Sequence, residues 1–436
     1  MVQRKSASFP LAAMAIEDHL DFRFMDFASG RTAHRNFLVR KELTGEEDGV
    51  LPTSPSKRQG QRDFLFKKKL EWRPGRSYFE ALEEALEEAL RALHAAHGGT
   101  DVLDDLRRLV ISVPGVIKDR TRVVQLPLWT WPFKPAVNFD FSDVIPRIIR
   151  RITSKDPNID VIVVNDTVAG ATAAYFHDVS RARSGIAEQT QTSAYLRAHN
   201  GINLAYVEHG RLHRDHSEAG HVLPFRHPID DKNDFMGVCP YHVCCVEGFL
   251  APRSWTERAK PGREGVTPVK KWKSRFFGSR AARYSDEVID AMIMKELMRG
   301  KRRENSEELE IQPDETAQDI TAFYLAQLMY TAFLLPPAPQ RIYVGGRMAT
   351  EPIIKQARVY VGEFMKGYPD RDSLVSLDLA IRKISTSGQR FLELSGALLL
   401  GLTLTIDPGS DGQSGKRLPR PHYVDLDTAA KVLFGQ

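Results

Sequence analysis

The sequence predicts an α/β protein with mixed sheets. Strand-like apolar runs alternate with amphipathic helical segments along most of the chain, and this order places helices against the faces of sheets. The length of 436 residues exceeds that of one ordinary domain and suits two lobes with insertions. Hydrophobic residues make up 42% and charged residues 27%, so the composition is that of a globular protein.

The first third of the chain is predicted to begin with strands and to continue into a long helix. Strands are expected at 12–16, 22–27 and 36–41, followed by a polar loop at 46–62. Ser77 and Glu80 have the spacing of a capping box, the leucines that follow recur at helical intervals, and Gly98 can end the helix. A helix is therefore expected over 77–97. The continuous apolar run at 108–113 predicts a buried strand.

The same alternation continues to the C-terminal part of the chain. Further strands are expected at 161–164, 194–197, 202–208 and 341–344, and further helices at 167–176, 319–334 and 389–402. The second and third of these strands form a hairpin. Two similar lobes are consistent with this pattern, although the pattern alone does not require them.

The segment 259–315 reads as an insertion rich in Lys and Arg, with a helix at 285–299. A solvated surface appendage is the simplest interpretation. Trp272, Phe276 and Phe277 lie among the basic residues, which keeps a nucleic-acid patch as a minor alternative. A docking site for an anionic partner is a further, weaker alternative. The net charge is only +5, so nucleic acid is not the expected partner.

Cellular location is predicted from two absences in the sequence. No run of about 18 apolar residues is present, so no membrane span is expected. The apolar patch at 9–16 is followed at once by Glu17, Asp18 and Asp21, and no signal-peptide cleavage pattern stands out. The expected location is the cytoplasm.

All three cysteines, Cys239, Cys244 and Cys245, fall within seven positions, and histidines lie nearby. Zinc prefers about four nitrogen or sulfur ligands in a tetrahedron. Cys239, His242 and Cys245 are spaced three apart, so a tight turn can bring them onto one ion, and His221 can supply the fourth ligand. His227 is the alternative fourth ligand, and Cys244 is expected to point away. Packed core side chains are the competing interpretation, which the clustering of every cysteine disfavours.

The same segment resembles the signature of the repressor–ORF–kinase (ROK) family, and is most similar to its fructokinase branch. Glu218-Ala-Gly-His221 precedes Cys239-Pro-Tyr-His-Val-Cys-Cys245-Val-Glu247-Gly. Weaker similarities occur in the family's order over about 109–402, with the insertion excluded. They are found at 112–115, 127–129, 163–166, 322–327, 341–346 and 394–397.

The resemblance implies a two-lobed actin-like ATPase (ribonuclease H-like) fold. The implied lobes are 1–170 and 171–436, and the second carries the zinc loop at 221–248. The resemblance also implies a hexose as ligand, a structural Zn²⁺, Mg²⁺ with ATP, and a homodimer as the assembly.

The resemblance also assigns roles to individual residues. Glu218, His221 and Glu247 fall on the sugar-binding positions, where carboxylates can accept hydrogen bonds from hydroxyls. Asp166 falls on the catalytic base, and Asn165 on a position that binds a sugar hydroxyl. The competing role for Asn165 and Asp166 is capping of the helix that follows. Capping and catalysis are compatible.

The nucleotide side departs from the family pattern. The family's Asp-x-Gly-Gly-Thr turn corresponds to 17–21, which has three carboxylates and no glycine. Carboxylates repel a triphosphate unless a metal ion intervenes. In the second turn, at 198–203, only Gly201 is retained. Gly345 and Gly346 are retained as nucleotide-binding candidates, but Arg347 follows them where the family has a small residue.

Two functions are consistent with this combination. The first is an ATP-dependent hexose kinase acting on fructose or a related sugar, with Glu17 or Asp21 helping to hold Mg²⁺. The second is a pseudokinase, a sugar-binding or sensing protein without phosphoryl transfer. A repressor of the family would carry an N-terminal helix-turn-helix, and none is expected before Leu109.

Overall fold

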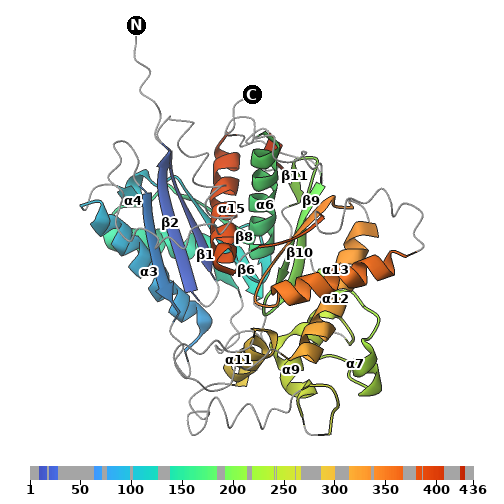
Figure 1. Ribbon diagram of the computed structural model, residues 1–436. Coiled ribbons are helices and arrows are strands. Elements are labelled where there is room, and N and C mark those ends of the chain that lie inside the picture. Colours follow the sequence, from blue (N-terminus) through green and yellow to red (C-terminus); the bar gives the residue numbers. More distant parts are fainter. Residues whose placement is uncertain are drawn as a thin grey trace, which may run out of the picture.

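A computed structural model describes most of the elements that the sequence predicts (Figure 1). The described residues are 9–16, 19–27, 63–70, 76–98, 102–125, 138–183, 192–213, 219–239, 241, 243–260, 262–266, 286–299, 314–334, 338–366, 380–384, 386–406 and 423–427. Among these residues, no helix combines the length and apolar character needed to cross a bilayer.

The first sheet has the strand order β3-β2-β1-β4-β8. Its strands are β1 (Phe9–Ile16), β2 (His19–Phe27), β3 (Asp63–Lys69), β4 (Arg108–Val113) and β8 (Asp160–Asn165). The strands β1, β2 and β3 form an antiparallel meander, whereas β4 and β8 run parallel to β1. The register aligns Leu11 with Arg108 and Val113 with Asn165, so the carboxyl ends of the parallel strands lie along one edge.

The second sheet repeats this order as β11-β10-β9-β12-β13, with β14 added beside β11. Its strands are β9 (Thr192–Ala198), β10 (Ile202–Glu208), β11 (Arg211–His213), β12 (Arg341–Gly345), β13 (Ile381–Lys383) and β14 (Tyr423–Asp425). Again the first three strands are antiparallel, and the next two run parallel to the first. The duplicated topology supports the two-lobed fold class, while the lobe boundaries at 1–170 and 171–436 stay a prediction.

Two long helices lie side by side between the sheets (Figure 1). They are α6 (Asp166–Arg183), which packs on β9 and β10, and α15 (Thr386–Ile406), which packs on β1 and β4. Their small and aliphatic side chains form one continuous buried cluster with the facing sides of both sheets. This central layer fixes how the first sheet sits against the second.

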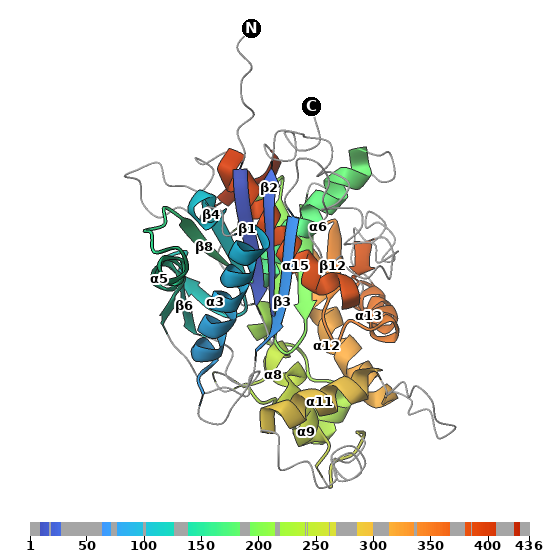
Figure 2. The same cartoon turned by 90° about the vertical axis from the view of Figure 1, so that its left-hand side faces the viewer.

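The outer face of the first sheet is covered by α3 (Tyr78–Ala96), α4 (Val102–Asp105) and α5 (Phe141–Thr153), as Figure 2 shows. The predicted capping box of α3 is confirmed, since the Ser77 hydroxyl accepts a hydrogen bond from the Glu80 N–H and the Glu80 carboxylate accepts one from the Ser77 N–H. Gly98, at φ +68°, follows the helix in the left-handed conformation. A small sheet of β5 (Val116–Lys118), β6 (Arg122–Gln125) and β7 (Phe139–Asp140) lies beside this layer.

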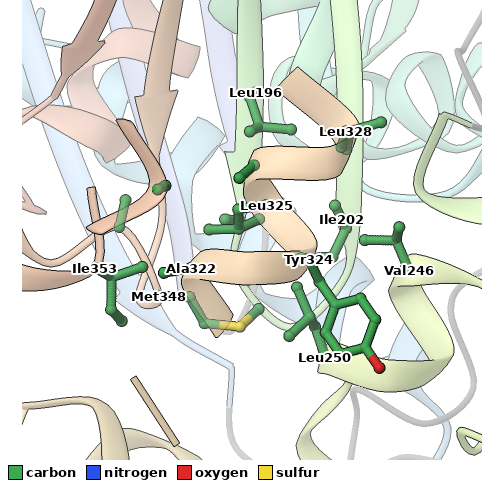
Figure 3. Packing of buried hydrophobic residues seen from close by; sticks show 14 of the residues in the cluster. Leu196, Ile202, Val246, Leu250, Ala322, Tyr324, Leu325, Leu328, Met348 and Ile353 are labelled. Carbon is green, nitrogen blue, oxygen red and sulfur yellow. The ribbon is translucent and has the colours of Figure 1, made fainter. Parts of the chain in front are cut away.

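The outer face of the second sheet is covered by α12 (Glu315–Leu334) and α13 (Glu351–Phe364). Figure 3 shows Leu325 and Leu328 of α12 packed among Leu196, Ile202 and Val246. The same core continues into shorter elements. These are η3 (Ala219–His221), α7 (Pro228–Lys232), α8 (Val246–Leu250), α9 (Pro252–Arg258) and α11 (Asp286–Arg299). Packing of α11 against α9 and α12 makes this part of the predicted insertion an element of the core, not a solvated appendage.

The third strand of the first sheet differs from the expectation. Residues 36–41 lie outside the described residues, and the observed third strand is β3, at 63–69. Its lysines at 67–69 obscure the strand pattern in the sequence. An edge strand tolerates such charges, because only one of its sides needs a neighbour. The register pairs Phe22 with Phe66 and Phe24 with Phe64, which partly buries the apolar part of the segment.

The contact between α6 and α15 predicts a sensitive position. A Cβ atom at Gly396 would lie 1.8 Å from the carbonyl oxygen of Ala169, so Gly396→Ala must push the helices apart. Alanine favours a helix over glycine by about 1 kcal/mol, but overpacking typically costs about 1–3 kcal/mol and a backbone clash lies at the upper end. We therefore expect a lower free energy of unfolding, measured by chemical denaturation. Val359→Ala, at an exposed position of α13, is the control. Wild-type stability for Gly396→Ala would contradict this contact.

Candidate functional site

Asn165 and Asp166 lie where β8 ends and α6 begins, and both side chains are buried. The N–H of Thr167 points toward both side chains, at 2.9 Å from Asn165 Oδ1 and 2.7 Å from Asp166 Oδ1. Asn165 Nδ2 also donates to the carbonyl oxygen of Gly115, at 3.2 Å, in the Pro-Gly segment after β4. The capping role is therefore confirmed. In open α/β sheets the carboxyl ends of strands are also where ligands usually bind.

Arg197 and Glu393 are the site residues that sequence reasoning missed. Arg197 Nε lies 3.2 Å from Asp166 Oδ2 and 2.7 Å from Glu393 Oε1. All three side chains are at least nine-tenths buried. A sequence signal existed, because Arg197 stands inside an otherwise uncharged strand and a buried charge requires a partner. No local pattern indicated which residue that partner would be.

The predicted metal site is partly assembled. His221, Cys239 and Cys245 offer donor atoms that lie within 4.8 Å of one another. His221 Nδ1 is 3.6 Å from Cys245 Sγ and 3.9 Å from Cys239 Sγ. Zinc bond lengths of about 2.3 Å to sulfur and about 2.0 Å to nitrogen place tetrahedral donors about 3.6 Å apart. The donor set and its spacing therefore fit a zinc ion.

The backbone holds this cluster from several sides. Val238 N donates to the Gly248 carbonyl oxygen at 2.9 Å, and Val246 N donates to the Val222 carbonyl oxygen at 3.1 Å. Burial raises the pKa of the Cys245 thiol to about 12, and the neighbouring Cys239 contributes to the rise. A bound divalent cation reverses this tendency, because it stabilises the thiolate.

Of the other candidate metal ligands, Cys244 and His227 are described by the structure and His242 is not. Cys244 Sγ lies 3.7 Å from the sulfur of Met236, outside the cluster, as expected for the spare cysteine. His227 caps α7 through Nδ1 and contacts Asp319 through Nε2, at 3.2 Å, so the alternative that makes it a metal ligand is not supported. His242 lies outside the described residues and stays a prediction.

Glu247 links the metal loop to the β9–β10 turn. Its Oε2 atom accepts a hydrogen bond from the N–H of Ile202, at 3.3 Å, and the side chain is buried. Gly220 of η3 fits between them, since a Cβ there would lie 2.0 Å from the Ile202 carbonyl oxygen and 3.1 Å from Glu247 Oε2. Glu247 and His221 thus come from segments that pack on the same turn. Glu218 lies outside the described residues.

The three glycines predicted to bind nucleotide are located around the β9–β10 turn. Gly346, at φ +116°, packs so closely that a Cβ would lie 1.9 Å from the Ala198 carbonyl oxygen. Gly345 pairs with Arg197 in the parallel register of β12 and β9. Gly201 closes the turn, where its carbonyl oxygen accepts from the N–H of His199 at 3.0 Å. Arg347 Nη1 approaches Asn200 Oδ1 at 3.5 Å, so larger polar side chains occupy this turn.

The carboxylate-rich turn between β1 and β2 is described only in part. Asp21 lies on β2, opposite Ala15, and its carboxylate is 3.7 Å from Lys67 Nζ on β3. Glu17 and Asp18 lie outside the described residues. The suggestion that Glu17 or Asp21 helps to hold Mg²⁺ stays a prediction.

A buried ion pair anchors the metal loop to the core. Arg258 donates two hydrogen bonds of 2.7 Å to the Asp230 carboxylate, and its guanidinium stacks over Phe235 and Trp255. The Tyr324 hydroxyl donates to the same carboxylate, at 2.7 Å. Burial raises the pKa of Tyr324 above its usual range, so this hydroxyl stays a donor. The network joins α7, α9 and α12 into one rigid support.

No protein-family model matches the chain. Among curated proteins, the chain is 28% identical over 222 residues to a fructokinase of Zymomonas mobilis, and 25% identical over 257 residues to a fructokinase of Streptococcus mutans. These alignments cover 49% and 58% of this chain, and 58% and 67% of the respective relatives.

Solved structures are similar to the chain at low sequence identity, and one with a TM-score of 0.51 shares its fold. The glucokinase of Balamuthia mandrillaris, solved in complex with glucose, has a TM-score of 0.51 and 11% identity, with 91% of this chain and 95% of that chain covered. A ROK family glucokinase of Streptomyces griseus, solved with glucose and AMPPNP, has a TM-score of 0.48 and 16% identity, with 90% and 99% covered. The similarity to curated fructokinases agrees with the resemblance to the fructokinase branch of the ROK family that the sequence motifs indicate.

Proposed function

We propose that the protein is a sugar kinase that transfers the γ-phosphate of ATP to a hydroxyl of a fructose-like hexose. Similarity to fructokinases supports the class of reaction. The observation that carries the proposal is the position of Asp166, a buried carboxylate at the carboxyl end of a parallel strand and at the start of α6.

The reaction assigns Asp166 the role of general base. The carboxylate accepts the proton of the attacking hydroxyl, whose oxygen forms a bond to the γ-phosphorus while the bond from phosphorus to the leaving ADP breaks. Asn165, Glu218, His221 and Glu247 bind the sugar, and Gly201, Gly345 and Gly346 face the nucleotide. Mg²⁺ bound with ATP supplies neutralisation of phosphate charge.

The metal cluster has a structural role in this proposal. Three protein donors are already gathered, and His242 supplies the fourth, so the Zn²⁺ site is closed and keeps no open position for substrate. The ion fixes His221, and with it the segment that approaches Glu247. Hexose binding would therefore depend on the metal, because the metal would hold His221 and its segment in position.

A sugar-binding protein without phosphoryl transfer is the second candidate. It is favoured by the side chains of His199, Asn200 and Arg347 around a turn where the family has small residues. Side chains at such a turn hinder the close approach of phosphates to its backbone N–H groups.

The kinase proposal predicts formation of ADP only in the presence of a hexose. Each hexose is tested with Mg²⁺ and ATP in a coupled assay for ADP. Asp166→Asn should lower kcat by roughly 10²- to 10⁴-fold, because the general base is lost. Asp143→Asn, an exposed carboxylate of α5, is the control and should keep wild-type turnover. Thermal stabilisation of the wild type by a hexose, without turnover for any hexose, would select the second candidate.

The metal proposal predicts about one zinc per chain by elemental analysis. Cys245→Ser should lose most of the metal, because a hydroxyl is a poor replacement for a zinc-bound thiolate. Cys244→Ser is the matched control: the two cysteines are neighbours, but the Cys244 sulfur faces Met236. Equal metal content in the two variants would remove Cys245 from the site.

A further inference from the structure

A buried arginine of the second sheet joins two carboxylates that belong to different helices of the central layer. Arg197 lies on β9 of the second sheet, Asp166 at the start of α6, and Glu393 on α15. The guanidinium Nε donates to Glu393 Oε1 at 2.7 Å and lies 3.2 Å from Asp166 Oδ2. Charged residues are rarely so deeply buried without partners, and here both carboxylates face the same nitrogen.

The surroundings of Arg197 leave its position well defined. Every residue of β9 is buried. Gly345 is the partner of Arg197 in the parallel register and contributes no side chain next to it. On the opposite side of Asp166, Oδ1 accepts from the N–H and the hydroxyl of Thr167, at 2.7 and 3.2 Å. The carboxylate is therefore held at one oxygen by its own helix and at the other by the second sheet.

We propose that Arg197 is a positioning residue for Asp166, and that Glu393 determines how tightly Arg197 holds it. This inference rests on the proposed function, in which the Asp166 carboxylate contacts a hexose hydroxyl. The Nε–H bond is directed to Glu393, and Asp166 Oδ2 lies 3.2 Å from the same nitrogen, so the two carboxylates compete for one cation. Loss of the charge on Glu393 turns the guanidinium toward Asp166.

The proposal is tested with Arg197→Gln, Arg197→Lys and Glu393→Gln in the full-length protein. Arg197→Gln should lower kcat by at least about tenfold with little change in the KM for ATP, because a misplaced base mainly slows transfer. Arg197→Lys should recover part of the loss, because it keeps the charge. Arg197→Lys also replaces Arg197→Gln as the test variant if Arg197→Gln fails to fold.

The pH dependence of kcat separates positioning from general support of the fold. Removal of the cation in Arg197→Gln should move the acidic limb of the profile to higher pH, since the ionised carboxylate loses a favourable charge. Glu393→Gln should move the same limb to lower pH, since a competing negative charge is lost and Arg197 turns to Asp166. Shifts in opposite directions are not expected from two variants that merely loosen the structure.

Arg341→Gln provides a matched control. Arg341, on β12, also joins the second sheet to α6, through its ion pair with Asp178. Asp178 lies twelve residues after Asp166, about 18 Å along the helix. This variant loses a similar link and should leave the pH profile unchanged. A shift equal to that of Arg197→Gln, or unchanged kcat and pH profile in all Arg197 and Glu393 variants, would overturn the assignment.

A hexose-binding measurement distinguishes failure of the inference from failure of the proposed reaction. If the wild type binds a hexose without turnover, the proposed phosphoryl transfer is wrong. The role of Arg197 is then tested by the Kd for the hexose, measured by calorimetry in the wild type and the variants. Asp166→Asn and Arg197→Gln should then raise the Kd for the hexose by a similar factor, about tenfold for the loss of one charge-assisted hydrogen bond. Weakening by Asp166→Asn alone would overturn the assignment, and a wild type that binds no hexose would overturn both proposals.

Discussion

The close approach of α6 and α15 is the constraint on which the rest of the structure depends. Gly396 lies against the Ala169 carbonyl oxygen, where a methyl group has no room. Asp166 and Glu393 each lie three residues before this contact on their own helix, so one helical turn separates both carboxylates from it. The distance between the helices therefore sets the distance between the carboxylates, and only a small gap can be bridged by one guanidinium group. The packing of the central layer therefore also determines the geometry of the candidate site.

Local sequence signals predicted the elements well where their causes are local. The capping box at Ser77 and the apolar run at 108–113 act within a few residues, and the structure confirms both. The strand at 63–69 escaped prediction because its lysines are tolerated only at the edge of a sheet, and the edge exists only after β1 and β2 have paired. Sheet order is a long-range property in the same sense. The repeated topology of the two sheets could be proposed from the alternation of elements, but it could not be derived from it.

In the candidate site, too, the residues with local sequence signals could be predicted, and those that depend on long-range packing could not. His221, Cys239 and Cys245 could be grouped because metal ligands act through residue type and short spacing, which a sequence displays. Arg197 carried a visible anomaly, a charge inside a buried strand. Its carboxylate partner Glu393 lies 196 positions away and could be identified only from the packing of α15. Residue types therefore sufficed to group these three candidate metal ligands, whereas the environment of Asp166 required the three-dimensional structure.

The β9–β10 turn connects these two sides physically. Glu247 and Gly220, from the metal loop, pack on Ile202 at one side of the turn, and Gly346 packs on Ala198 at the other. Contacts that exclude even a methyl group leave little freedom for one side to move without the other. The turn therefore joins the metal loop to β9, the strand that carries Arg197. The polar side chains at the turn and Arg197 are thus neighbours on one continuous segment of the chain, β9 and the turn that follows it.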